Sequence, residues 1–145
     1  VNRSTLLAEW QWMLGEQKLP ILVTAMGTAF VEDTQDGTIS LLDPGEGKLR
    51  EIAGSREEFE RLLSDQAFVL EEFLVVDFVS LRNGGSSLLP GQVFGFVRPP
   101  VLGGSFDIEN LKPTDMEVHF SLLGQIHRQV KDLPDGVPIS QVTIS

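Results

Sequence analysis

The sequence predicts an α+β domain spanning residues 1–145, in which an antiparallel β-meander packs against about three to four helices. Three observations support this fold class. The length of 145 residues is typical of one domain. A content of 41% hydrophobic and 22% charged residues is ordinary for a globular chain. Apolar residues follow a helical period near the start, a period of two up to about residue 52, and both periods afterwards.

The chain opens with a predicted helix. Ser4 or Thr5 is placed to cap its start, and Gly15 is placed to end it. Residues two apart on a helix differ by about 200° of rotation, so Trp10 and Trp12 cannot face the same core. We therefore expect one exposed tryptophan, which is a candidate interface residue. The apolar face of the helix contains Leu6, Leu7, Trp10, Met13 and Leu14.

Four short β-rich segments come next, separated by turn signals. We expect strands at residues 21–25, 28–32, 38–42 and 48–52. Asp36-Gly37 is a tight-turn signal, and the segment Asp-Pro-Gly-Glu-Gly at 43–47 forms the next turn. This pattern predicts an antiparallel meander with one buried face.

A capping box starts the next helix. Ser55 and Glu58 are spaced so that each side chain can accept a hydrogen bond from a free amide at the helix start. A second apolar run covers residues 68–81, and we interpret it as helical. The β-branched residues between positions 73 and 79 argue against that interpretation.

In the last third of the chain, some segments have the strand period of apolar residues and others have the helical period. Residues 92–97 predict a strand, which Pro99-Pro100 ends. The second half of residues 115–133 is helical in spacing. Its first half alternates by two, so a strand running to about His119 and a helix both remain open. Residues 137–144 favour an edge strand.

Composition excludes several classes of function. The chain has no cysteine, which rules out disulfides, thiolate zinc sites and cysteine nucleophiles. That composition fits a reducing compartment, and we expect a cytoplasmic protein. The first ten residues lack an apolar run of signal-peptide length, and the longest apolar segment is too short to cross a membrane. We therefore expect no membrane association.

Charge is the most unusual bulk property. The chain has 21 acidic and 11 basic residues, for a formal net charge of −10. Such a surface repels phosphate backbones, so we expect no nucleic-acid binding. It attracts a protein partner with a basic surface.

Known catalytic motifs are missing from the sequence. There is no Gly-x-Ser-x-Gly elbow, no P-loop and no dinucleotide fingerprint. His119 and His127 are the only histidines. On one helix they would lie roughly 12 Å apart along the axis and about 80° apart around it, too far to share an ion. We predict no catalytic residue, no metal and no cofactor.

Five polar residues stand among apolar neighbours in the stretch from 91 to 136, and they are the candidate interaction or pocket residues. Each is interpreted either as part of an internal hydrogen-bond network or as part of a binding surface. The five residues are Arg98, Asn110, His119, Gln125 and His127.

The same stretch resembles a known family. The similarity is carried by Gly-Gln-Val-Phe-Gly-Phe at 91–96, Pro-Pro-Val-Leu-Gly-Gly at 99–104, Glu-Asn at 109–110, His119, and Gly-Gln-Ile-His at 124–127 with the Pro-Asp-Gly turn that follows. It resembles a bacterial domain of unknown function related to the C-terminal domain of type VI secretion immunity proteins. The resemblance implies a protein that neutralises a toxin, in at least one case a DNase, by binding it, and it implies no catalytic residues.

Three functions remain open at this point. The first is a non-catalytic, immunity-like binding module that docks on a basic toxin such as a nuclease through its acidic surface. The second is a small hydrolase or metal-dependent enzyme that uses His119 and His127. The third is a structural homodimer formed through the β-rich tail or an exposed tryptophan, so the chain is expected to be a monomer or a homodimer.

Overall fold

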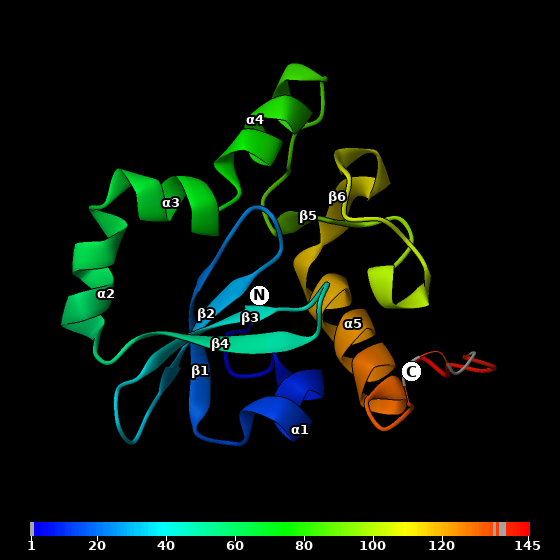
Figure 1. Ribbon diagram of the computed structural model, residues 1–145, viewed down its shortest axis with the longest axis horizontal. Coiled ribbons are helices and arrows are strands. Elements are labelled where there is room, and N and C mark those ends of the chain that lie inside the picture. Colours follow the sequence, from blue (N-terminus) through cyan, green and yellow to red (C-terminus); the bar gives the residue numbers. More distant parts are fainter. Residues whose placement is uncertain (1, 135, 137–138) are drawn as a thin grey trace.

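A computed structural model describes residues 2–134, 136 and 139–145 (Figure 1). Its central feature is a four-stranded antiparallel sheet in the order β1-β2-β3-β4, which confirms the predicted meander. β1 begins three residues earlier than expected, because an edge strand with a bulge accommodates Pro20. The strands are β1 (Lys18–Val23), β2 (Ala29–Asp33), β3 (Ile39–Asp43) and β4 (Lys48–Ala53).

The N-terminal segment is less helical than the spacing predicts. A 3-10 turn, η1 (Ala8–Trp10), leads into the short helix α1 (Gln11–Leu14), which ends at Gly15 with φ of 72°. Neither Ser4 nor Thr5 caps a helix. Instead the Asn2 side chain accepts hydrogen bonds from the amide and hydroxyl of Ser4, which holds the preceding residues in turns.

The expectation of an exposed tryptophan is wrong. Trp10 is fully buried and Trp12 is partly buried, and their rings stack with centroids 5.7 Å apart. The segment is not one continuous α-helix, so the 200° rule does not apply to it. The Trp12 indole N–H also donates to the Gly124 carbonyl at 3.3 Å, which holds the ring against another helix.

Three consecutive helices form an arch along the sheet: α2 (Arg56–Leu63), α3 (Gln66–Glu72) and α4 (Val75–Asn83). The Ser55 hydroxyl accepts the Glu58 amide at 3.1 Å, whereas the Glu58 carboxylate accepts the amide of Gly54 at 3.0 Å. The predicted helical run from 68 to 81 is confirmed, but it is split in two at Leu74. Leu74 has φ of 51°, a left-handed conformation that redirects the chain.

The last third contains a second sheet. β5 (Gln92–Phe96) pairs antiparallel with β6 (Leu111–Asp115), and the short 3-10 turns η2 (Pro100–Leu102) and η3 (Ile108–Asn110) lie between them. The 15-residue helix α5 (Met116–Val130) follows directly. A strand as far as His119 is therefore wrong, because the Asp115 carboxylate accepts the Val118 amide at 3.0 Å and starts the helix.

The predicted edge strand in the tail is also wrong for residues 139–144, which form no strand. Positions 137 and 138 of that prediction lie outside the described residues. Hydrogen bonds from two glutamine side chains hold the end of the tail instead, as described below.

Helices cover both faces of the four-stranded sheet, so the prediction of one buried face is wrong. On one face the N-terminal segment and α5 pack against Ala29, Val31 and Leu42. On the other face α2 and α3 pack against Phe30 and Leu41. The burial of β2 shows this directly. Successive residues of a strand point to opposite faces of the sheet, and Ala29, Phe30 and Val31 are all fully buried.

The fold is therefore a single mixed α+β domain, as predicted, with five α-helices in the described part of the chain rather than three to four. α4 joins the two sheets, because a third apolar cluster contains Met26, Leu81 and Phe94. Among the described residues, no helix has both the length and the apolar character needed to cross a membrane.

Candidate functional site

The five predicted site residues do not converge on one pocket. Arg98 and Asn110 meet each other in the loop that joins β5 to β6. The Asn110 side chain accepts the Arg98 amide at 3.0 Å and donates to the carbonyls of Arg98 and Ser105, both at 2.7 Å. The Arg98 guanidinium donates to the Leu102 carbonyl at 2.9 Å. These two residues close the loop on itself, and a role for them in partner contact stays a prediction.

His119 lies on α5 and reaches the turn between β1 and β2. Its Nε2 is 2.8 Å from the Gly27 carbonyl, and the side chain is 3% exposed. A side chain at position 27 would overlap this ring, because a Cβ there would stand 2.4 Å from Nε2. Burial lowers the pKa of His119, and the Gly27 carbonyl partly opposes that shift. The neutral imidazole therefore connects α5 to the β1–β2 turn.

His127 lies two turns further along α5, beneath the turn between β3 and β4. Its ring packs against Trp10 at a tilt of 37° with centroids 5.6 Å apart, and a Cβ at Gly47 would stand 2.4 Å from Nδ1. Burial lowers the pKa of His127, against the opposing effect of the Gly45 and Pro44 carbonyls and of the Asp43 carboxylate. His119 and His127 thus contact different turns. Among the described residues, no group of three or more His, Cys, Asp or Glu side chains is arranged to hold a metal ion.

The two buried histidines predict a pH-dependent stability. A lowered pKa in the folded state means that the unfolded chain binds the proton first, near pH 6.5, so stability falls as the pH drops below about 6.5. Each histidine contributes a slope of at most about 1.4 kcal/mol per pH unit. Urea unfolding at pH 7.5 and 5.5 measures the loss. His119→Gln, which keeps a donor for Gly27, is expected to remove part of the slope, and an unchanged slope would contradict this account.

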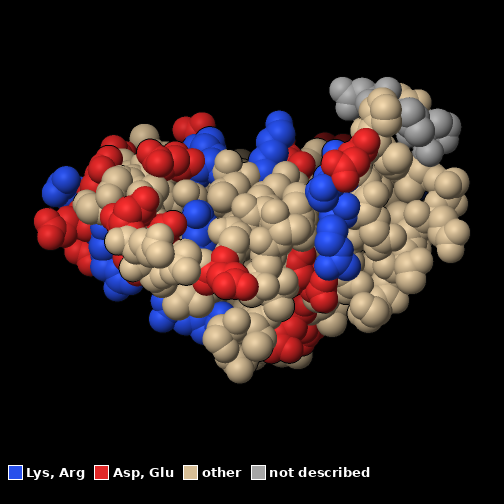
Figure 2. All heavy atoms as spheres, turned by 90° about the horizontal axis from the view of Figure 1, so that it is seen from below, with Lys and Arg blue, Asp and Glu red and all other residues tan. Residues whose placement is uncertain are grey.

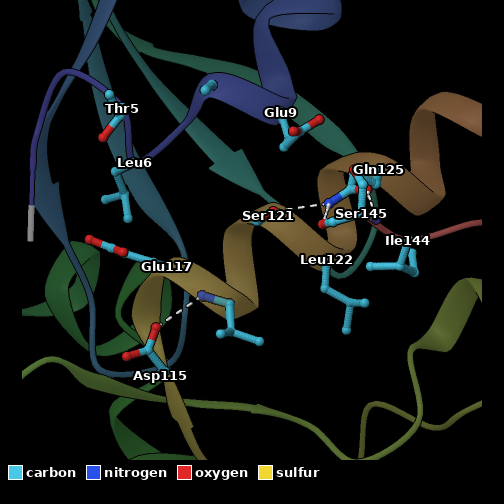
Figure 3. Close-up of a pocket in the computed structure, with 12 residues that line it drawn as sticks. Thr5, Leu6, Glu9, Asp115, Glu117, Ser121, Leu122, Gln125, Ile144 and Ser145 are labelled. Carbon is cyan, nitrogen blue, oxygen red and sulfur yellow. Dashed lines mark hydrogen bonds between the residues drawn. The ribbon is translucent and has the colours of Figure 1, made fainter.

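Gln125 borders a groove between α5 and the N-terminal segment. The groove has a volume of about 430 Å³, and Thr5, Leu6 and Glu9 face α5 across it (Figure 3). Gln125 is only 2% exposed, and its carboxamide contacts the hydroxyl of Ser121 and the backbone of Ser145. Of the five predicted residues, Gln125 is the one that lines this groove.

The outer surface of the helical arch, residues 56–83, is a second candidate site that sequence reasoning did not single out. It exposes four apolar side chains, with Val76 the most accessible at 72%. They are accompanied by seven carboxylates and three arginines. Figure 2 shows acidic side chains interspersed with basic ones toward the end of the molecule where α2 lies, whereas the opposite end is mostly uncharged. The four apolar residues are Leu70, Leu74, Val76 and Val79.

Two ion pairs fasten this arch to the sheet. Arg50 of β4 pairs with Glu72, and Arg56 of α2 pairs with Glu32 of β2 at 2.7 Å. Side-chain hydrogen bonding and charge attraction from these carboxylates raise the pKa of both arginines. The arch is thus held in a defined position, which reduces the entropy that binding would cost.

The arch was missed because its exposed apolar residues look like core residues in the sequence. Leu70, Val76 and Val79 belong to one apolar run in the sequence, but the run is split at Leu74 and all three residues are exposed. Gln129 contacts the tail next to Gln125, and the sequence contained a signal for this: the two glutamines are four residues apart and therefore share one helix face.

One known family matches a segment that includes the arch and part of the groove. The family model described as "T6SS immunity protein Tdi1, C-terminal" matches residues 53–127, just over half of the 145 residues. The match includes the whole arch, both strands of the second sheet and most of α5. No curated protein matches the sequence significantly.

Proposed function

The chain belongs to the family of the T6SS immunity protein Tdi1 C-terminal domain, and on that premise we propose that it neutralises a basic toxin, such as a nuclease, by docking on it through the arch. The family supports an immunity-like binding protein with a protein partner. The finer statements, which concern the basic character of the toxin and the surface used, rest on the arguments below. We also propose that the protein acts by binding alone, without catalysing a reaction.

The observation that carries the proposal is the mixed character of the arch. Protein interfaces combine an apolar centre with a polar rim, and the centre must be accessible before binding. Val76 and Val79 provide such a centre on α4, at 72% and 46% exposure. Glu57, Glu60 and Glu71 are exposed on the neighbouring helices and belong to no ion pair among the described residues. All of these residues lie inside the segment that the family model matches.

The charge of the arch determines which partner fits. Residues 56–83 contain seven acidic and three basic residues, so the segment has a net charge of −4. A nuclease binds the phosphates of its substrate with basic side chains. Carboxylates on a fixed helical surface can occupy the same basic cleft, and they also accelerate association by electrostatic steering. A toxin that cleaves DNA acts in the cytoplasm, and we infer the same location for this protein.

Charge reversal on the arch tests this function. The variant Glu60→Lys/Glu71→Lys is expected to weaken binding to the toxin encoded beside its gene by at least about tenfold, because two attractive charges become repulsive. The control Glu16→Lys/Asp132→Lys changes the net charge equally at exposed positions outside the arch. Calorimetric titration and a growth-protection assay measure the two effects.

The outcomes separate the surface from the function. Equal losses in both variants would mean that only bulk charge matters and would reject the arch as the docking surface. If the arch variant binds the toxin as tightly as the wild type, the arch is also rejected as the docking surface. A wild-type chain that neither binds the neighbouring toxin nor protects cells from it would reject the immunity function itself.

A further inference from the structure

Residues 143–145 lie along α5 at one end of the groove between this helix and the N-terminal segment, where Ile144 and Ser145 form part of its wall. The Thr143 amide donates to the Gln129 side-chain oxygen at 2.9 Å, and the Gln129 side-chain nitrogen donates back to the Thr143 carbonyl at 2.6 Å. Gln125 makes the same pair of bonds with Ser145, at 2.8 and 3.2 Å. Each carboxamide therefore satisfies both backbone groups of one tail residue.

This arrangement reproduces the hydrogen bonding of an antiparallel strand pair. A glutamine side chain offers one acceptor and two donors, so it can replace a peptide group of a neighbouring strand. Residues four apart on a helix are about 6 Å apart along its axis. Alternate residues on a strand are about 6.8 Å apart, which is nearly the same distance. Gln125 and Gln129 therefore match Thr143 and Ser145 with antiparallel direction.

The recognition uses the backbone of the tail and little of its side chains. Thr143 and Ser145 are exposed, and the side chain of Ile144 remains 45% exposed although it borders the groove. The Ser145 hydroxyl adds one bond, to the Gln125 oxygen at 3.0 Å. An extended segment of different sequence could make the same four backbone bonds, as in β-strand addition at a sheet edge.

The groove continues along α5 past Ser145 toward the start of the helix, and its lining there is acidic. Asp115 and Glu117 line this end, Glu9 lines the groove beside Gly124, and the lining contains no lysine or arginine (Figure 3). Glu9 is held by Arg128 at 3.2 Å, whereas Glu117 is exposed. A basic side chain on a segment running past the position of Ser145 would meet this part of the groove.

We propose that the face of α5 formed by Gln125 and Gln129, together with the groove beside it, is a binding site for an extended segment of a partner protein with a basic side chain, and that residues 143–145 occupy the two glutamines as an intramolecular competitor. Gln125 and the residues of α5 that line the groove lie inside the segment matched by the family model, whereas the N-terminal side of the groove and the tail lie outside it. α5 also covers the face of the sheet opposite to that covered by α2 and α3. The groove is therefore a site distinct from the arch and independent of the function proposed for it.

The distance along α5 sets the design of a probe. Gln125 and Glu117 are eight residues apart, about 12 Å along the helix, which an extended strand spans in three to four residues. The probe is a fluorescent peptide with the sequence of residues 141–145 followed by Ala-Ala-Lys-Lys. A second peptide ends in four alanines instead. Fluorescence anisotropy on the full chain measures binding of each.

Release of the tail is expected to open the site. The variant Thr143→Pro/Ser145→Pro removes both amide donors of the tail, so it should bind the lysine peptide at least tenfold more tightly than the wild type. Gln129→Leu in that background should reduce the affinity at least tenfold. Gln129 is exposed, so folding is not at risk, and Gln66→Leu on α3 is the matched control.

Each result decides one part of the proposal. Equal peptide binding before and after tail release would overturn the competitor role. An unchanged affinity in Gln129→Leu, or an equal loss in Gln66→Leu, would overturn the glutamine clamp. If the alanine peptide binds as tightly as the lysine peptide at low salt, the partner segment needs no basic side chain. None of these measurements uses a toxin, so they are independent of the test of the arch.

Discussion

Replacement of Trp10 with alanine is expected to lower the free energy of unfolding by about 3–5 kcal/mol, the range for a buried aromatic residue truncated in a core. Trp10 is fully buried, stacks on Trp12, packs against the tilted ring of His127, and donates its indole N–H to the Phe120 carbonyl at 2.9 Å. The mutation leaves a cavity between the N-terminal segment and α5 and removes that hydrogen bond. A domain is typically stable by only about 5–15 kcal/mol, so the loss is a large fraction of the total.

Urea unfolding followed by circular dichroism measures this effect. Trp12→Phe is the control, because Trp12 is only partly buried and phenylalanine loses mainly its 3.3 Å hydrogen bond to Gly124. We expect the control to lose about 1 kcal/mol. If both variants lose the same amount, Trp10 has no special role in holding α5 against the sheet.

Replacement of Gly104 with alanine is also expected to destabilise the protein strongly. A Cβ at this position would stand 1.9 Å from the Arg98 carbonyl oxygen and 2.9 Å from the Asn110 side-chain nitrogen. The carbonyl belongs to the backbone and cannot rotate away, so the loop must open and lose its Asn110 hydrogen bonds. We expect a loss of about 1–3 kcal/mol, the usual cost of overpacking a closed site.

Gly84→Ala is the matched control for that change. Gly84 has φ of −80°, and a Cβ there would meet only ordinary contacts of 3.4 Å or more. The same substitution at Gly84 is therefore expected to be neutral or slightly stabilising, because it reduces the entropy of the unfolded chain. Thermal unfolding of both variants compares them. If Gly84→Ala is less stable than the wild type and Gly104→Ala is equally stable, the steric argument is wrong.

Local rules predicted the parts of the fold that depend on neighbouring residues. Asp36-Gly37 forms a turn, and Gly37 has φ of 79°. The Ser55 cap and the order of the four strands were also correct. In each case the interactions that decide the structure lie within a few residues, so the sequence contains them directly. The strand β6 was missed because Lys112 and Pro113 do not favour a strand, and only pairing with β5 makes them one.

The same difference between local and long-range interactions applies to the candidate residues. Polar residues in an apolar frame were singled out as candidates, but the partners of two of them are distant in the chain. His119 contacts Gly27, 92 residues away, and Gln125 contacts Ser145, 20 residues away. No spacing rule gives such contacts, because they depend on how helices and sheets pack.

The amino-acid sequence alone established the α+β class, the meander, the acidic charge and the family, because composition, period and motif are local properties. Tertiary structure decided the rest. It covered both faces of the sheet, left Val76 exposed after the break at Leu74, and placed two glutamines at the spacing of an extended strand. These outcomes depend on long-range packing and on a single left-handed residue, whose effects appear only when the whole chain is folded.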